Sequence, residues 1–256
     1  MAFTHIWNKL YLYRQKVTLA GVLALLLMGG NTAEAQKKVH DLNKPGYDER
    51  PVHYGFYLAV PLTKYNVQRS QTYADKLAQG GDDAVNARPD LGFYTGLVLN
   101  VRITDYLDAR FVPGVGFYGR TLAFENVEVP GVETQPIMYE TVSSTMIELP
   151  VLLKYKAKRR SNFRPYIVAG VKPGFDLGKG SNGALGTNDI KLEVEKMDIA
   201  VEYGIGLDVF YPYFKFAPEL RFSHGLLNQH KRIDGLYSSY IQKLTNHNVS
   251  LIFFFE

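Results

Sequence analysis

Cysteine is absent from this sequence of 256 residues. Its absence excludes a disulfide framework, a cysteine-based zinc site, a thiol nucleophile and an acylated lipoprotein cysteine. Excess charge is also scarce: half of the formal net charge of +4 comes from the first 35 residues, and the longest basic run beyond them, residues 156–160, is too short to predict nucleic-acid binding. Aromatic residues, in contrast, make up 13% of the chain, which argues against an intrinsically disordered protein.

The chain also lacks an apolar run long enough for a transmembrane helix. The apolar run at residues 17–28 falls short of the roughly 20 residues that a spanning helix needs. It follows basic residues up to Lys16 and precedes the small-x-small pattern Ala33-Glu34-Ala35. This order predicts a secretory signal peptide that is cleaved between Ala35 and Gln36, with a short transmembrane anchor as the alternative.

Alternation of apolar and polar residues with a period of two recurs along the rest of the chain, as is typical of β-strands. It is clearest in residues 93–103, 147–156, 199–209 and 214–223, and weaker in residues 53–62, 107–118, 164–177 and 246–255. A tilted strand needs about ten residues to cross a bilayer, whereas strands of soluble sandwiches are nearer five or six residues long. Because one face of each segment is almost uncharged, we expect lipid outside and a polar lumen inside.

The connections between these eight segments alternate in length. Three are short, residues 104–106, 158–163 and 211–213, and four are long, residues 63–90, 122–143, 178–196 and 226–245. Outer-membrane barrels have short periplasmic turns and long extracellular loops. The sequence therefore predicts an all-β fold, an eight-stranded antiparallel transmembrane β-barrel in the outer membrane of a Gram-negative bacterium.

This fold divides the chain into three segments. We expect a signal peptide at residues 1–35, a polar N-terminal arm in the periplasm at residues 36–51, and the barrel at residues 52–256. The arm either docks a partner or serves as a linker.

Charged residues on the polar faces of the strands form the candidate site. An eight-stranded barrel is just wide enough for side chains to fill its interior, and buried charges there must be paired. We therefore predict a salt-bridged plug, with an ion or proton path as the alternative. The predicted lumenal charges are Arg102, Asp108, Arg110, Glu148, Lys154, Glu202, Asp208, Glu219 and Arg221.

A catalytic alternative rests on two histidines in the last long connection. His224 and His230 lie near Asp234 in the sequence, with Ser223 and Ser238 close by, and such residues can form a hydrolytic group at a barrel rim. Loop histidines are far more often solvated and without a role. We therefore predict no enzyme activity, no metal, no cofactor and no small-molecule substrate.

Two stretches of sequence resemble the PorT family of outer-membrane barrels. Residues 50–58, Arg-Pro-Val-His-Tyr-Gly-Phe-Tyr-Leu, resemble the opening of that family. Residues 147–156, Ile-Glu-Leu-Pro-Val-Leu-Leu-Lys-Tyr-Lys, resemble its "IELP-LLKYK" strand, and a basic turn and residues 162–166, Asn-Phe-Arg-Pro-Tyr, follow as they do in the family. The resemblance runs in order over the chain beyond the signal peptide, although the long loops match weakly.

The resemblance implies a component required for the type IX secretion system, which exports proteins such as virulence proteases and adhesins and supports gliding motility. Expected partners are outer-membrane lipid and other membrane or periplasmic proteins of that system. The family has no catalytic motif to carry over. The alternative is a structural or adhesion barrel whose extracellular loops bind a surface ligand.

Overall fold

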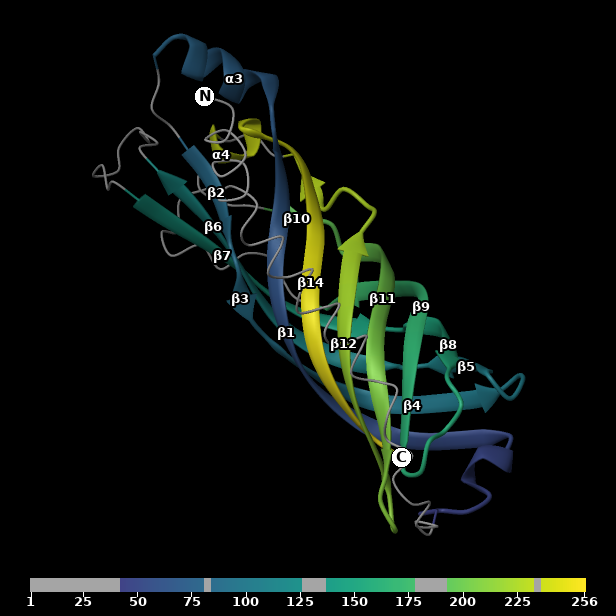
Figure 1. Ribbon diagram of the computed structural model, residues 1–256. Coiled ribbons are helices and arrows are strands. Elements are labelled where there is room, and N and C mark those ends of the chain that lie inside the picture. Colours follow the sequence, from purple (N-terminus) through teal and green to yellow (C-terminus); the bar gives the residue numbers. More distant parts are fainter. Residues whose placement is uncertain (1–41, 81–83, 126–136, 178–192, 233–235) are drawn as a thin grey trace, which may run out of the picture. The chain divides into compact units, whose positions relative to one another are not determined.

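β-strands make up most of the structure, a computed structural model that describes residues 42–80, 84–125, 137–177, 193–232 and 236–256 (Figure 1). In chain order the elements are η1 Tyr47–Glu49, β1 Val52–Arg69, α3 Gln71–Ala78, β2 Ala84–Arg88, β3 Asp90–Leu91, β4 Phe93–Arg102, β5 Leu107–Phe111, β6 Gly114–Glu125, β7 Ile137–Glu148, β8 Val151–Lys156, β9 Phe163–Asp176, β10 Glu193–Val194, β11 Met197–Phe210, β12 Lys215–Gly225, β13 His230–Lys231, α4 Leu236–Ser239 and β14 Ile241–Phe255. Within these residues no helix is both long enough and apolar enough to cross a membrane.

The strand pairings of the described residues form a closed circuit. Each strand of the series β1, β4, β5, β8, β9, β11, β12 and β14 pairs antiparallel with the next, and β14 pairs again with β1. β6 and β7 pair with each other and with β4 and β9, respectively. Where it is closed, such a circuit leaves no edge strand, which is how a β-barrel satisfies its backbone hydrogen bonds. Beyond Thr63, β1 pairs only with β14, and β2 pairs only with β6, among the described residues.

Prolines interrupt two long strands of this circuit at neighbouring positions. Pro113 follows β5 and Pro150 follows β7, and neither residue has a backbone N–H to donate to the ladder. The backbone N–H of Val112 donates to the carbonyl of Pro150 over 3.0 Å, so the two interruptions lie side by side. β5 and β6 are therefore two parts of one long strand, and β7 and β8 are two parts of another.

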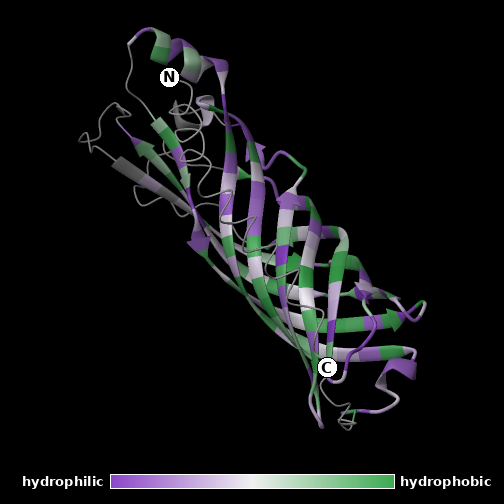
Figure 2. Ribbon diagram, in the orientation of Figure 1, coloured by the Kyte–Doolittle hydropathy of each residue, from purple (hydrophilic) through white to green (hydrophobic). Residues whose placement is uncertain are grey.

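The distribution of side chains is inverted relative to a soluble protein. Large apolar side chains are exposed on the outer face, among them Tyr54 at 80% and Leu97 at 64% of full exposure, whereas Asp208 and Arg221 inside are at most 1% exposed. Figure 2 shows the resulting alternation of hydrophilic and hydrophobic residues along the strands. Water cannot be the solvent of such an outer face, because an exposed apolar surface of this extent is found where lipid or another protein covers it.

The apolar outer face ends part-way along β1. Leu58, Val60 and Leu62 are exposed on it, and the next exposed residues of the same face are Lys64 and Asn66. The apolar part of β1, from residue 52 to residue 62, is roughly 33 Å long at 3.3 Å per residue. At a tilt of about 40° this length covers about 25 Å of height, the height of the apolar band of a membrane barrel.

Beyond the apolar band the pattern reverses, with polar side chains outside and an apolar cluster inside. The cluster consists of Tyr65, Tyr73, Val85, Leu122, Phe124, Val142, Tyr240, Ile241 and Leu244, from β1, α3, β2, β6, β7, the residue after α4, and β14. The helix α3 begins at the N-cap Ser70, whose hydroxyl accepts a hydrogen bond from the Tyr73 N–H. This end of the barrel therefore has an apolar interior and a polar exterior, like a water-soluble protein.

Several strands extend further than the sequence predicted. β1 continues to Arg69 and is followed by α3 and β2, where residues 63–90 were expected to form a loop. β6 likewise continues to Glu125, β7 begins at Ile137 and β14 begins at Ile241, inside stretches that were also expected to be loops. The prediction of these boundaries was wrong because the apolar residues change from the outer to the inner face, which breaks the alternation on which the prediction depended.

Candidate functional site: a buried ion-pair network and its N-terminal cap

Asp208 on β11 is the centre of one group of buried charges. Its carboxylate lies 2.7 Å from Lys154 Nζ of β8, 3.1 Å from the Arg164 guanidinium of β9 and 3.9 Å from Lys215 Nζ of β12. Its side chain is completely buried. A carboxylate without water is stable only when cations and hydrogen bonds replace its solvation, and here three neighbouring strands supply them.

A second group forms a row of alternating charges across the interior. Glu219 accepts hydrogen bonds from Arg110 at 2.8 Å and from the Tyr166 hydroxyl at 2.9 Å, and it also pairs with Arg221. The other ion pairs of the row join Arg221 to Glu202 at 3.3 Å, Glu202 to Lys172 at 3.3 Å, and Lys172 to Glu148 at 2.9 Å. Glu219 and Glu202 each lie between two cations, and Glu148 ends the row against Lys172, so each acid of the row has a cation beside it.

Eight of the nine residues singled out in the sequence lie in such buried pairs. Besides the residues of the two groups, Asp108 pairs with Lys156 at 2.5 Å. Arg102 differs, because it lies half-buried at the end of β4 and pairs with Asp105 in the following turn.

Sequence reasoning missed several cations of these groups. The missed cations are Lys156, Arg164 and Lys215, close to strand ends, and Lys172, inside β9. Each is an even number of residues away from an inward-facing residue of its strand, as Lys215 is from Glu219. The alternation could therefore have found them.

The described part of the predicted arm, residues 42–51, folds over the end of the barrel. Tyr47, in the short helix η1, is 7% exposed and stacks on His53 at a ring distance of 4.1 Å. Its hydroxyl donates to Glu256 Oε2 at 3.3 Å. Burial, together with the neighbouring Glu256 carboxylate, raises the pKa of Tyr47 well above its ordinary value, so the phenol stays a donor.

Polar contacts connect this N-terminal cap, residues 43–49, to the ion-pair network. Arg164 binds Asp48 of the cap at 2.5 Å and Asp208 of the network at 3.1 Å, so one guanidinium bridges both. The Asn43 side chain donates to the Phe210 carbonyl over 2.9 Å, and Arg159 donates to the Asn43 carbonyl. This part of the arm is therefore a folded element of the barrel, whereas residues 36–41 and the predicted cleavage site lie outside the described residues.

The two histidines of the catalytic alternative take part in different contacts. His224 Nδ1 lies 2.7 Å from His247 Nδ1, and its Nε2 lies 3.0 Å from the Tyr203 hydroxyl. His230 Nε2 lies 3.1 Å from the Ser238 hydroxyl, and Asp234 is outside the described residues. Among the residues that the structure describes, no three His, Asp or Glu side chains are grouped so that they could hold a metal ion.

Side chains fill the interior beside the ion pairs. The cavity lined by Arg120, Glu148, Lys172, Asp198 and Ser223 has a volume of about 10 Å³. That is close to the space that one water molecule needs. This cavity among the described ion pairs is therefore too small for a substrate.

Comparison with known families decides what kind of barrel this is. Residues 34–231 match the family described as outer membrane protein beta-barrel domain. The chain belongs to this family. It is an all-β outer-membrane barrel of a Gram-negative bacterium, as the sequence predicted. No curated protein matches it.

Solved structures similar to this outer-membrane barrel protein include Neisserial surface protein A, with 13% identity and a TM-score of 0.37 over 80% of this chain and 97% of that one. OprG from Pseudomonas aeruginosa has 11% identity and a TM-score of 0.40 over 78% of this chain and 93% of that one. Ail, the attachment invasion locus protein of Yersinia pestis, has 10% identity and a TM-score of 0.33 over 79% and 96%. Structural similarities this low give no information about activity or partners.

Proposed function

We propose that this outer-membrane barrel is a non-catalytic accessory component of the type IX secretion system and that it acts by contact with other components. The observation that carries the proposal is the filled interior, in which ion pairs such as Lys154–Asp208 and Arg110–Glu219 occupy the space inside the strands. An interior of this kind cannot pass a folded protein. A role in export must therefore be exerted through the outer surfaces of the barrel.

The stretches that resemble the PorT family supply much of the network and cap. Residues 147–156 contribute Glu148, Lys154 and Lys156, and residues 162–166 contribute Arg164 and Tyr166. Residues 50–58 include His53, on which Tyr47 stacks. The resemblance is thus concentrated in side chains that act together in space, which supports the assignment to a PorT-like function.

We propose eight membrane-crossing strands, with β5–β6 and β7–β8 each counted as one interrupted strand. In this arrangement the short turns at residues 103–106, 157–162 and 211–214 face the periplasm together with the cap. The apolar cluster and α3 then lie on the extracellular side. Partner proteins of the periplasm or membrane would contact the cap and the short turns.

The test of the secretion role is a deletion strain in which type IX cargo is measured in the medium and in the cells. Retained, unprocessed cargo with an otherwise intact outer membrane is the expected result. Complementation with the double charge reversal Glu49→Arg/Arg50→Glu, at the exposed last residue of the cap and the exposed residue after it, is expected to restore export poorly. The control Arg88→Glu, at an exposed position of β2, is expected to restore export fully. Normal export in the deletion strain would overturn the proposal.

A second candidate function is a structural or adhesion barrel that binds a surface ligand at the other end. The observation that favours it is the packed cluster around Tyr65, Tyr73 and Leu122, which gives the long connections a rigid base. Normal export combined with lost surface binding in the deletion strain would favour this candidate. Substitutions in exposed positions of α3, such as Asp75 and Leu77, would then reduce binding.

A further inference from the structure

An apolar groove crosses the outer wall of the barrel near the short-turn end. Its volume is about 660 Å³, within the range of small-molecule sites, and its lining is almost entirely apolar. One side of the groove is a row of outward side chains on five neighbouring strands. In cross-strand register these are Tyr155, Ile167, Ile205, Leu220 and Leu251.

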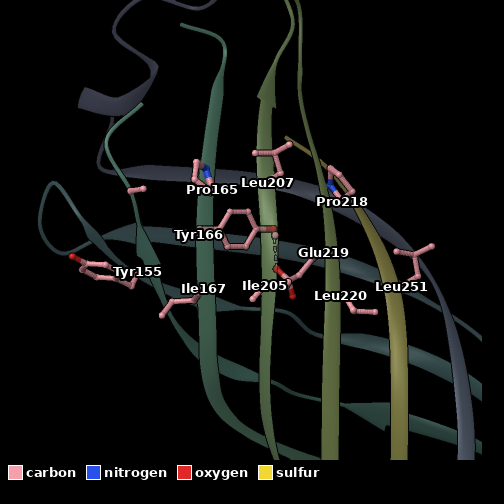
Figure 3. A pocket seen from close by; sticks show the side chains of 12 residues that line it. Tyr155, Pro165, Tyr166, Ile167, Ile205, Leu207, Pro218, Glu219, Leu220 and Leu251 are labelled. Atoms are coloured by element: carbon pink, nitrogen blue, oxygen red, sulfur yellow. Dashed lines mark hydrogen bonds between the residues drawn. The ribbon is translucent and has the colours of Figure 1, made fainter. Parts of the chain in front are cut away.

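The second side of the groove is a shorter row nearer the turns. It consists of Pro165, Leu207 and Pro218, and Figure 3 shows the two rows with Tyr166 and Glu219 between them. Residues of the two rows are two positions apart along each strand, which separates the rows by roughly 6.6 Å. Apart from Tyr155, the outward side chains of both rows are aliphatic, which suits a hydrocarbon chain.

The strands themselves form the floor of the groove. Tyr166, Gly206 and Glu219 lie in register between the two rows, and the Tyr166 and Glu219 side chains are buried on the inner face. Gly206 has no side chain, and the Tyr166 ring lies so close to it that an added Cβ would be 2.3 Å from the ring. The floor is therefore closed by protein, and the groove opens only to the outside.

A basic turn adjoins the groove. Ala157 lines the groove and is the first residue of the turn between β8 and β9, which continues with Lys158, Arg159 and Arg160. Arg159 is engaged with the cap, because it donates to the Asn43 carbonyl and lies against the Phe210 ring. Lys158 and Arg160 are exposed, and neither is ion-paired with a described residue.

We propose that the groove binds an acyl chain of an anionic phospholipid whose phosphate is held by Lys158 and Arg160. A membrane lipid carries a hydrocarbon chain and a negative charge in one molecule, which matches an apolar groove that leads to a basic turn. The choice of a phospholipid over lipopolysaccharide rests on the orientation in the proposed function, in which this turn faces the periplasm. The lipid binding itself does not depend on a role in secretion.

The test uses the purified full chain, reconstituted in phosphatidylcholine vesicles with a trace of lipid spin-labelled near the end of an acyl chain. Electron paramagnetic resonance measures the fraction of labelled lipid whose motion the protein restricts. Labelled phosphatidylglycerol is expected to associate more strongly than labelled phosphatidylcholine, by about fivefold for each cation that contacts the phosphate. Equal association of the two lipids would overturn the proposal.

Two pairs of variants locate the bound lipid. Lys158→Gln/Arg160→Gln is expected to abolish the preference for phosphatidylglycerol, whereas Lys64→Gln/Arg88→Gln removes the same charge from exposed positions elsewhere and is expected to keep it. Ala157→Trp fills the end of the groove below the turn and is expected to reduce the restricted fraction of both lipids. Its control, Ala169→Trp, lies on an exposed position of β9 outside the groove and is expected to leave that fraction unchanged.

Other outcomes of the same measurement contradict the proposal. If both tryptophan variants act alike, the restricted lipid is not in the groove. If unlabelled lipopolysaccharide displaces the label better than phosphatidylglycerol does, the lipid class is wrong. Heat-modifiable migration on a detergent gel identifies variants that fail to assemble. The secretion assay is scored separately, so the lipid-binding proposal and the secretion proposal can fail independently.

Discussion

Lys154 Nζ lies 2.7 Å and 2.9 Å from the two carboxylate oxygens of Asp208, although 54 residues separate the two in the sequence. Both side chains are buried, and Arg164 and Lys215 also approach the carboxylate. Arg164 also pairs with Asp48 at 2.5 Å and Lys215 with Glu256 at 2.6 Å, so of the three cations Lys154 depends most on Asp208. Removal of Asp208 would leave Lys154 as a buried cation with no ion-pair partner among the described residues.

The variant Asp208→Asn is expected to lower the free energy of unfolding by about 3–5 kcal/mol, because it leaves the buried Lys154 ammonium without its counter-charge. A urea titration in lipid vesicles, followed by the gel shift between folded and unfolded barrel, measures the loss. Asp105→Asn is the matched control, since the Asp105 side chain is 74% exposed and its pair with Arg102 is worth less than about 1 kcal/mol. Equal losses in the two variants would contradict the role of Asp208.

Two arginine substitutions on the outer face of β1 test whether lipid covers that face. Leu58→Arg places a charge in the apolar band and is expected to cost about 2–4 kcal/mol and to reduce assembly. Asn66→Arg is on the same strand and the same face but beyond the band, so we expect little effect. The yield of heat-modifiable barrel in membranes measures both, and a harmless Leu58→Arg would show that lipid does not cover this face.

The N-terminal cap is expected to open when Tyr47 is truncated. Tyr47→Ala removes a buried ring, at a cost of about 3 kcal/mol, which corresponds to roughly a hundredfold increase in local opening. Limited proteolysis after Lys44 or Arg50 in the intact barrel measures this opening. Glu49→Ala, an exposed position of the same short helix, is expected to leave the cleavage rate unchanged; similar rates in both variants would mean that Tyr47 does not hold the cap.

Gly206 is required by the ring of Tyr166. An added Cβ would lie 2.3 Å from that ring, so we expect Gly206→Ala to cost about 1–3 kcal/mol. In a Tyr166→Leu background the cost should be smaller, and the difference is the coupling energy of a double-mutant cycle. Gly119→Ala is the control, because its Cβ would meet Asp90 at an ordinary 3.6 Å; an unchanged cost in both backgrounds would disprove the contact.

The membrane-facing parts of the fold could be read from the sequence because they follow a local rule. Residues 199–209 alternate strictly, and the structure exposes Ile205 while it buries Asp208. The same rule failed at residues 63–90, where apolar residues such as Tyr65 and Val85 turn inward to a soluble core. Where a strand passes from lipid into water, its apolar residues face inward instead of outward. Nothing local in the sequence marks the residue at which this change occurs.

The sequence by itself determined the all-β class, the lipid-facing wall and most of the charges that lie inside it. These features depend on the period of two residues and on the incompatibility of charge with lipid. The tertiary structure alone decided which charges pair, that Asp48 reaches Arg164 across 116 residues, and that residues from five strands line one groove. Such contacts depend on the register of strands distant in the chain, and register is set by the closure of the whole sheet.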